Sequence, residues 1–373
     1  MAIYFLLFFA AAILAISNMK PSANVLSKNF NLLLSPASFL LFICLVIFIG
    51  LRHETGGDWG NYIYQLQKAS MNSMQIGGDP LYQVILNYAA SFKCEIDTRE
   101  CAFNGRGLQF LNLVCAIFFC FGLMVFCNHQ PRPWLALCVA IPYLVIVVGI
   151  GYTRQAAALG LVMLAYTAIS QGRLLQYCFW IFVGASIHKT AIVMLPFLLF
   201  AAKKNKSLIF AAGTIIALVL YYFFFIEIAR SLFQNYIGAE YDSAGALIRI
   251  GMNAIPAIIF LYFRDSFALN DTAKNFWSGI SYSALILFLL YFISPSSTAI
   301  DRIGLYLIPL QLFVLSRLPD ALGTYGARNP KIHYLIVMYS ALVLIVWIFF
   351  SSNAANWIPY QSFIWVLLGI VSE

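Results

Sequence analysis

The sequence predicts an all-α membrane protein, a polytopic integral bundle of helices. Hydrophobic residues make up 62% of the 373 positions and charged residues only 10%, whereas soluble domains carry about 25% charged residues. The apolar residues also fall in repeated blocks about as long as a bilayer is thick. Because no repeat and no low-complexity linker separates these blocks, we expect one transmembrane domain over residues 1–373.

The apolar blocks predict roughly 11–14 membrane segments, since a full helical crossing takes about 20 residues. The blocks lie at 2–17, 37–51, 108–127, 134–151, 155–170, 174–187, 190–202, 207–226, 250–263, 276–293, 303–316, 332–350 and 361–372. The first block has no basic residues before it and no small-residue cleavage motif after it. We therefore expect it to be a retained helix and not a cleaved signal peptide.

The formal charge of +8 is distributed unevenly between the two sides of the membrane. The loops that follow odd-numbered segments carry twelve Lys or Arg and four Asp or Glu, which accounts for the whole excess. The loops that follow even-numbered segments hold ten of each sign. The positive-inside rule therefore assigns the first set to the cytoplasm, and no nucleic acid is expected as a partner.

The stretch 174–202 is expected to form a short re-entrant-like hairpin. IHKT at 187–190 interrupts it, and each half is shorter than the ~20 residues of a full crossing. A single helix would place Arg173 and the KKNK at 203–206 on opposite sides, although both belong to the basic loops. We expect the apex of the hairpin to lie below the outer surface and to line a watery cavity.

The loop 52–107 is the longest departure from the membrane pattern. Its segments 62–70 and 79–92 have amphipathic helical spacing, so we expect surface helices there. The loop also contains Cys94 and Cys101, which would form a disulfide in an oxidising compartment; the alternative is two free thiols. We expect 52–107 and a second outward loop, 227–249, to contribute to the functional site.

Ionisable and polar residues gather at the outward ends of five separate segments. They are Arg52, Glu54 and Asp58, then Arg154 and Gln155, then His188 and Lys189, then Arg249, and finally Asp301 and Arg302. Each has an ordinary explanation when taken alone, such as snorkelling for an arginine or helix capping for an aspartate. Four of the five segments nevertheless present arginine, whose planar fork suits phosphate. The joint pattern predicts a site for a phosphate or pyrophosphate on a lipid carrier.

The outward cluster also contains groups that can remove a proton from an attacking hydroxyl. The candidates are His188, Glu54 and Asp58. The sequence has no HExxH, Walker, GxSxG or CxxC motif, so it does not support a metalloprotease, an NTPase or a serine hydrolase.

Five stretches of the chain resemble the EpsG-type branch of the Wzy-like polysaccharide polymerases. In order they are RHETGGDWGNY (52–62), YTRQAAALGLVMLAY (152–166), SIHKTAIVMLP (186–196), DRIGLYLIP (301–309) and NWIPY (356–360). The Cys-bearing insert around 93–107 departs from the pattern of that family.

The resemblance implies a bacterial inner-membrane glycosyltransferase whose active site faces the periplasm. It would transfer a growing glycan from undecaprenyl diphosphate onto the distal sugar hydroxyl of an incoming lipid-linked repeat unit. O-antigen polymerase is the leading expectation, with capsule or exopolysaccharide polymerase close behind. The implied partners are the undecaprenyl-diphosphate-linked donor and acceptor, membrane lipid, a chain-length regulator and a flippase. Alternatives are an O-antigen ligase or other lipid-linked glycosyltransferase, a polysaccharide flippase or transporter, and a membrane acyltransferase that uses His188.

The roles expected within such an enzyme follow from side-chain chemistry. Arg154, Arg249 and Arg302 would bind the donor pyrophosphate with Lys189 and Gln155 beside them, and Arg52 would hold the acceptor diphosphate. His188 is preferred over Asp58 as the base, because histidine titrates near ambient pH. Three arginines would replace a divalent cation, so no metal and no other cofactor is expected. Sugar faces would stack on Tyr62, Tyr152, Trp357 and Tyr360, for which interfacial anchoring is the alternative.

Overall fold

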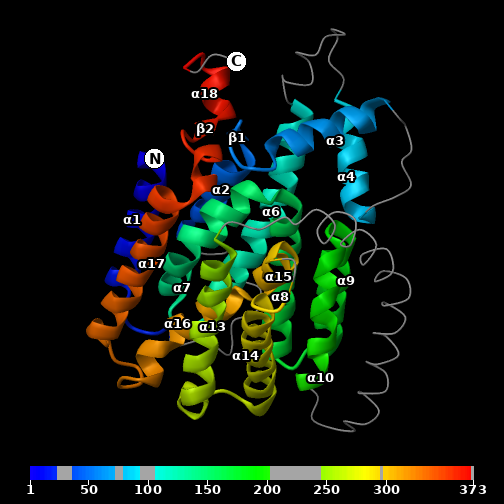
Figure 1. Ribbon diagram of the computed structural model, residues 1–373. Helices are drawn as coiled ribbons and strands as arrows, with labels where there is room; N and C mark the ends of the chain where they lie inside the picture. The colour runs from blue at the N-terminus through cyan, green and yellow to red at the C-terminus, as the bar shows by residue number, and fades with distance from the viewer. Residues whose placement is uncertain (23–35, 72–78, 93–105, 202–244, 295–296, 371–373) are drawn as a thin grey trace.

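The computed structural model describes residues 1–22, 36–71, 79–92, 106–201, 245–294 and 297–370, and in these residues the chain is a bundle of helices (Figure 1). The all-α fold class is therefore confirmed. Three expectations fall outside the described residues: the Cys94–Cys101 disulfide, the membrane segment 207–226 and most of the loop 227–249.

The helices keep the order in which the apolar blocks occur. The α-helices are α1 (Ala2–Ser17), α2 (Pro36–Gly50), α3 (Trp59–Met71), α4 (Pro80–Ala90), α6 (Arg106–Asn128), α7 (Pro133–Ala140), α8 (Thr153–Ser170), α9 (Leu174–Ile187), α10 (Leu198–Ala201), α13 (Ala246–Phe263), α14 (Asp271–Tyr291), α15 (Ser297–Gly304), α16 (Pro309–Ala321), α17 (Pro330–Phe350) and α18 (Phe363–Leu367). A π-helix, η2 (Ile141–Gly149), continues α7, and 3₁₀ turns form η3 (Lys189–Phe197), η6 (Arg264–Phe267), η7 (Leu305–Leu307) and η8 (Ser352–Asn356).

Several helices are long and apolar enough to cross a bilayer, so the chain is a multi-pass membrane protein. Among the described residues, full-length spans are Arg106–Asn128, Ala246–Phe267 and Pro330–Phe350, and a fourth is the pair Ser297–Leu307 and Pro309–Ala321, bent by 45°. Shorter apolar helices are Ala2–Ser17, Pro36–Gly50, Pro133–Gly149, Leu174–Ile187 and Lys189–Ala201. Most of the segments expected from the sequence are therefore shorter or less apolar than a full crossing.

The two ends of the bundle differ in character. The turns after α1, α6, α8, α13 and α16 meet at the lower end in Figure 1, where they line a cavity of about 910 Å³. We call this the basic end, because Arg173 and Arg317 line the cavity and Arg132 is buried against Asp320 beside it. The opposite end, which we call the site end, carries β1, the starts of α4 and α8, and the junction between α9 and η3. The turns that lie together at the basic end are those that the sequence assigns to one side of the membrane.

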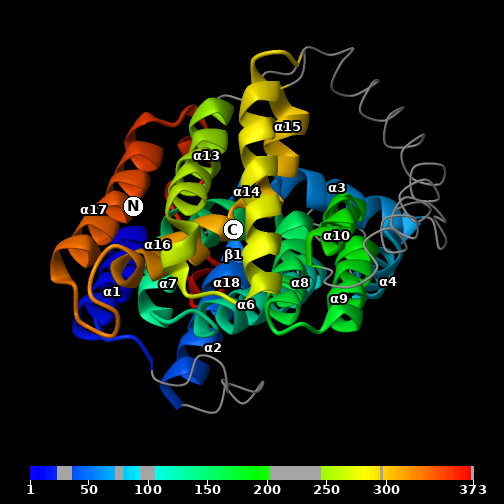
Figure 2. The ribbon, with the colours of Figure 1, turned by 90° about the horizontal axis from the view of Figure 1, so that it is seen from below.

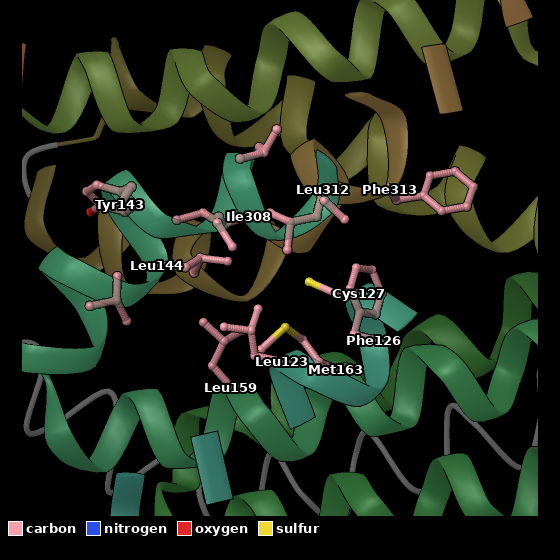
Figure 3. Close-up of a cluster of buried hydrophobic side chains, with 14 of the residues drawn as sticks. Leu123, Phe126, Cys127, Tyr143, Leu144, Leu159, Met163, Ile308, Leu312 and Phe313 are labelled. Atoms are coloured by element: carbon pink, nitrogen blue, oxygen red, sulfur yellow. The ribbon is translucent and has the colours of Figure 1, made fainter. Parts of the chain in front are cut away.

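The core lies where α6, η2, α8 and α16 meet. Figure 3 shows Leu123 of α6, Leu144 of η2, Leu159 of α8 and Leu312 of α16 pointing toward one another. Seen from below, α13, α14 and α17 flank one side of this core, and α6, α8 and α9 lie on the other (Figure 2). Because lipid is as apolar as these side chains, close packing and not exclusion of water holds the helices together.

Glycine lets α6 and α8 approach each other more closely than any other side chain would allow. A Cβ built on Gly122 would lie 1.8 Å from the carbonyl oxygen of Gly160, and one built on Gly160 would lie 2.4 Å from the carbonyl oxygen of Phe118. Small residues at a helix crossing are a common device in membrane bundles. The crossing matters for function because α8 begins with the arginine and glutamine of the candidate site.

Replacing Gly122 with alanine is expected to destabilise the protein by about 1–3 kcal/mol, because the backbone of α8 must move away. Gly251→Ala in α13 is the matched control, since a Cβ there meets nothing within 4 Å and alanine is the better helix former. Thermal unfolding of the detergent-solubilised variants measures both. Equal stability of the two variants would contradict the close crossing.

The predicted hairpin is confirmed, whereas the last predicted segment is wrong. α9 ends at Ile187, the next residue His188 is extended (φ −149°, ψ 108°), and the chain returns along α9 through η3 and α10. In the segment expected at 361–372, only Phe363–Leu367 is helical among the described residues. The preceding Gln361–Ser362 forms β2, which pairs antiparallel with β1 (Arg52–His53). Backbone pairing with the site end therefore replaces a membrane crossing.

The surface helices expected in 52–107 are also present, as α3 and α4. α4 buries Tyr82, Ile85 and Leu86 in a small satellite core that it shares with Tyr62 of α3. The packing of α4 against α6 and α9 brings the start of α4 close to the tip of the hairpin.

Candidate functional site

Arg52 holds together the ends of three helices at the site end. Its guanidinium is 1% exposed and donates to the carbonyl oxygens of Ile49 (Nη1, 2.8 Å) and Thr55 (Nε, 3.0 Å). Its Nη2 donates to Asn112 Oδ1 (3.2 Å) in α6 and to Thr153 Oγ1 (2.6 Å) at the start of α8. These four acceptors are neutral, so the arginine carries its full charge at the centre of the site end.

The glycine-rich turn after Arg52 packs directly against the turn that precedes α8. Gly56 has φ +107°, and a Cβ on it would lie 2.6 Å from the carbonyl oxygen of Ile150. Its N–H donates to the carbonyl of Asn356 at 2.8 Å. Only glycine tolerates this conformation at such close range, which explains the glycine at position 56.

Arg154 reaches from the start of α8 toward α4. Its Nη1 donates to Asp79 Oδ2 at 3.4 Å, and its guanidinium lies 4.9 Å from the centre of the Tyr82 ring. Its backbone N–H donates to the hydroxyl of Tyr62. The Arg154 side chain is 32% exposed, so it is the more accessible of the arginines at the start of α8 and in β1.

His188 lies at the tip of the hairpin, opposite the same carboxylate. The backbone N–H of Lys189 donates to Asp79 Oδ1 at 2.9 Å, and His188 Nδ1 lies 3.6 Å from Asp79 Oδ2. Asp79 precedes Pro80 at the start of α4, yet its side chain makes no hydrogen bond to its own helix. The carboxylate instead joins the hairpin to Arg154.

Gln155 connects the start of α8 to α15. Its Nε2 donates to the carbonyl oxygen of Arg302 at 2.8 Å, and its side chain is buried. The charge of Arg302 acts on both Asp58 and His188. Arg302 therefore belongs electrostatically to the same cluster as the hairpin tip.

Arg249 forms a bidentate ion pair with the residue that precedes Arg302. Its Nε and Nη2 donate to the two carboxylate oxygens of Asp301, each at 2.8 Å. Fork-to-fork pairing fixes orientation as well as charge. The pair joins α13 to α15, and Asn253 one turn further along α13 donates to the carbonyl of Gly304.

Asp58 lies in the turn between α2 and α3, within the field of three arginines and close enough to His188 to interact with it. Burial raises the pKa of its carboxyl, and the charges of Arg302, Arg154, Arg52 and His188 oppose that rise. A raised pKa means that the carboxylate takes up a proton at higher pH than an exposed aspartate does. Glu54 points differently: it is exposed and has a positive φ of 44°.

The sequence of these elements identifies the family. The model of the EpsG family matches residues 37–362, which run from the start of α2 to the end of β2. The chain belongs to the EpsG family. That family is associated with exopolysaccharide biosynthesis. No curated protein and no solved structure shows significant similarity to the chain.

The EpsG match contains every side chain of the cluster described above. It omits α1 and α18, neither of which supplies a residue to the cluster. The matched region therefore includes all the helices whose packing brings the starts of α4, α8 and α15 to the tip of the hairpin.

Three of the four aromatic residues expected to bind sugar are packed inside this EpsG protein. Tyr62 is 3% exposed, Trp357 3% and Tyr360 5%. Trp357 Nε1 donates to the carbonyl of Ile146 at 2.9 Å, and Tyr360 stacks on Phe48 with ring centres 4.9 Å apart. In this structure the three side chains are therefore covered by other parts of the protein. Tyr152 is half-buried at the start of α8.

Sequence reasoning missed Asp79 as a member of the site. It contacts Arg154, His188 and Lys189, and it is 5% exposed. The available signal was the Asp-Pro pair before an amphipathic helix, which predicts the start of α4. That signal indicates an ordinary helix cap, so it does not reveal a partner that lies 110 positions away in the chain.

Among the described residues, no group of three His, Cys, Asp or Glu side chains is arranged to hold a metal ion. The charges of the cluster come instead from the cations Arg52, Arg154, Lys189, Arg249 and Arg302 and the carboxylates Asp58, Asp79 and Asp301. The cations outnumber the carboxylates, so the described cluster favours an anionic ligand.

Proposed function

We propose that the chain is a Wzy-like polymerase that joins undecaprenyl-diphosphate-linked repeat units at the periplasmic face of the inner membrane. The observation that carries the proposal is the cluster at the site end, where Arg154, Arg302 and His188 come from three separate segments. Arginine is suited to a diphosphate and histidine to a proton transfer. Membership of the EpsG family supports a role in exopolysaccharide synthesis, and O-antigen is the leading product.

The proposed reaction is a substitution at the anomeric carbon of the donor glycan. The distal hydroxyl oxygen of the acceptor forms the new glycosidic bond, and the bond from the anomeric carbon to the diphosphate oxygen breaks. The bonding electrons leave with undecaprenyl diphosphate. The hydroxyl proton passes to Nε2 of His188, with Asp58 as the alternative base. Arg154 and Arg302 stabilise the negative charge that develops on the diphosphate.

The contacts of Arg249 and Arg52 favour roles other than direct binding of the diphosphate. Arg249 pairs with both oxygens of Asp301, so we propose that it positions Arg302 and contacts the diphosphate only by exchanging partners. Arg52 donates four hydrogen bonds inside the protein. It contributes a positive field but is not proposed as the ligand of the acceptor diphosphate.

The orientation of the protein follows from the charges of its loops. The positive-inside rule supports a cytoplasmic basic end, so we propose that the site end faces the periplasm. Donor and acceptor units delivered there by a flippase would meet the cluster from the outer leaflet. A separate chain-length regulator would act on the same assembly.

The test is reconstitution of the purified protein in liposomes with lipid-linked repeat units, with a lipid A core acceptor and an activated acetyl donor added in parallel reactions. The expected result is a ladder of glycans that differ by one repeat, with release of undecaprenyl diphosphate. Transfer only onto a lipid A core would indicate a ligase. Acetylated sugar without longer chains would indicate an acyltransferase, and movement of the units across the bilayer without new bonds would indicate a flippase. Each of these three outcomes would overturn the proposal.

Arg154→Lys is expected to reduce chain growth by about 10²–10³-fold, because an ammonium retains the charge but loses the planar fork. The protein level should not change, since Arg154 is partly exposed, its contact to Asp79 is long at 3.4 Å, and an ammonium can still lie over the Tyr82 ring. Arg173→Lys at the basic end is the matched control. Long polymer from the Arg154 variant would remove this residue from the diphosphate site.

A further inference from the structure

The side chains of Arg154 and His188 both approach the same carboxylate oxygen of Asp79. Oδ2 lies 3.4 Å from Arg154 Nη1 and 3.6 Å from His188 Nδ1, whereas Oδ1 accepts the N–H of Lys189 at 2.9 Å. The carboxylate is 5% exposed. Oδ1 therefore binds the backbone at the hairpin tip, and Oδ2 lies close to both Arg154 and His188 without a short hydrogen bond to either.

The contact to His188 is incomplete in this state. Its Nδ1 is buried and has no hydrogen-bond partner among the described residues, since 3.6 Å exceeds hydrogen-bond distance. An unpaired buried donor is costly, and a small movement toward Asp79 would satisfy it. The competing arginine is the more accessible group to an entering ligand, because its side chain is 32% exposed whereas that of His188 is 14% exposed.

We propose that Asp79 couples binding of the donor diphosphate to activation of His188. The proposal rests on the function proposed above and adds its regulation. A diphosphate that draws Arg154 away leaves Oδ2 to His188 Nδ1–H. The hydrogen bond then fixes the tautomer in which Nε2 carries the lone pair, and the carboxylate stabilises the imidazolium that forms when Nε2 takes the acceptor proton. Asp79 is in this sense a positioning residue.

The coupling has a chemical advantage. Four charged groups surround His188, namely Asp79 before α4, Arg154 from α8, Arg302 from α15 and Asp58 from the turn after α2. While Arg154 occupies Oδ2, the histidine lacks an oriented partner and is a poor base. Donor binding and base activation then occur together, so water is not activated at an empty site.

Asp79→Asn distinguishes the contact of Asp79 to His188 from its contact to the backbone of the hairpin. The amide oxygen can still accept the N–H of Lys189, whereas the amide nitrogen replaces Oδ2 and cannot accept from His188. Arg154→Gln tests the opposite direction, because it frees Oδ2 without any ligand. Asp265→Asn is the matched control, since Asp265 pairs with Lys274 in an exposed position at the basic end.

The experiment is ¹⁵N NMR of histidine-labelled protein in liposomes, where the chain has four histidines and His188→Gln identifies the signal of His188. The probe is undecaprenyl diphosphate, and undecaprenol is the lipid control without phosphate. We expect the diphosphate, and not the alcohol, to move Nδ1 of His188 to a hydrogen-bonded position in the wild type and in Asp265→Asn. Asp79→Asn should abolish the shift, and Arg154→Gln should show it before any lipid is added.

The outcomes separate the coupling from the function. Saturable binding of undecaprenyl diphosphate with an unchanged Nδ1 signal, or the same shift in Asp79→Asn, would overturn the coupling alone. Absence of saturable binding would overturn the diphosphate site itself and the coupling with it. The protein could also bind the diphosphate and show the Nδ1 shift but form no glycan ladder. That result would support the coupling and overturn the proposed polymerase function.

Discussion

His188→Ala is expected to slow chain growth by about 10²–10⁴-fold, the contribution of a positioned general base. Single lipid-linked repeat units should then accumulate while the protein level stays unchanged. The reason is that His188 lies at the tip of the hairpin, where its Nδ1 has no hydrogen-bond partner among the described residues and lies 3.6 Å from Asp79. The measurement is the length distribution of the glycan made by the reconstituted protein.

His129→Ala is the control for loss of an imidazole elsewhere. His129 lines the cavity at the basic end, and its Nδ1 is bonded to the carbonyl of Val125. Its removal should leave the glycan ladder intact. Near-normal ladders from the His188 variant would transfer the role of base to Asp58. In that case Asp58→Asn should give the loss, and the rate should fall with decreasing pH as the carboxylate, whose pKa burial raises, becomes protonated.

Arg52→Met is expected to destabilise the folded protein by about 3–5 kcal/mol, the usual loss when one partner of a buried charged network is removed. The variant removes the donor from the carbonyls of Ile49 and Thr55 and leaves only the long 3.4 Å hydrogen bond from Thr153 Oγ1 to Asn112 Oδ1 between α8 and α6. Lysine should rescue little, because one ammonium has three donors and cannot reach acceptors on opposite sides of a guanidinium. Thermal unfolding in detergent and the yield of monodisperse protein measure the effect.

Arg106→Met provides the comparison, since Arg106 is exposed at the start of α6. Surface substitutions of this kind change stability by about 0.5 kcal/mol or less. If Arg52→Met were as stable as Arg106→Met but had lost affinity for the acceptor, Arg52 would be a ligand of the acceptor diphosphate after all. The sequence favoured that role, and the contacts favour a structural one.

Much of the fold could be predicted because membrane helices follow from composition. The block 2–17 corresponds to α1, 332–350 to α17, and the interrupted block 174–202 to the hairpin of α9 and η3. The amphipathic stretch 79–92 likewise became α4. Each prediction needed only local hydropathy, a charge count and the length of a crossing.

The details of the site could be predicted less well, because they depend on contacts between distant parts of the chain. Asp79 and His188 meet only because α4 packs against α9, and no local pattern encodes that packing. The aromatic residues Trp357 and Tyr360 have the composition expected of a sugar platform. Whether their rings face a ligand or another helix is decided by packing, and here they face helices.

The last predicted segment was wrong for a related reason. Residues 361–372 are apolar enough to suggest a crossing, yet hydropathy does not reveal that β2 completes a backbone ladder with β1. The competing interaction is a hydrogen-bonded pair between residues at the two ends of the matched family region. A single sequence read by windows cannot detect it.

That pairing has a consequence for biosynthesis. The hydroxyl of Ser362 and the N–H of Phe363 both donate to the carbonyl of Leu51, 311 positions earlier in the case of the serine. Arg52 is synthesised and reaches the membrane long before its strand partner in β2 has been made. The β1–β2 pair beside the turn that carries Asp58 can therefore form only after the helices up to α17 have been synthesised. Nascent chains released before residues 361–362 are made would contain Arg154 and His188 but would lack the β1–β2 pair that fixes the turn between α2 and α3.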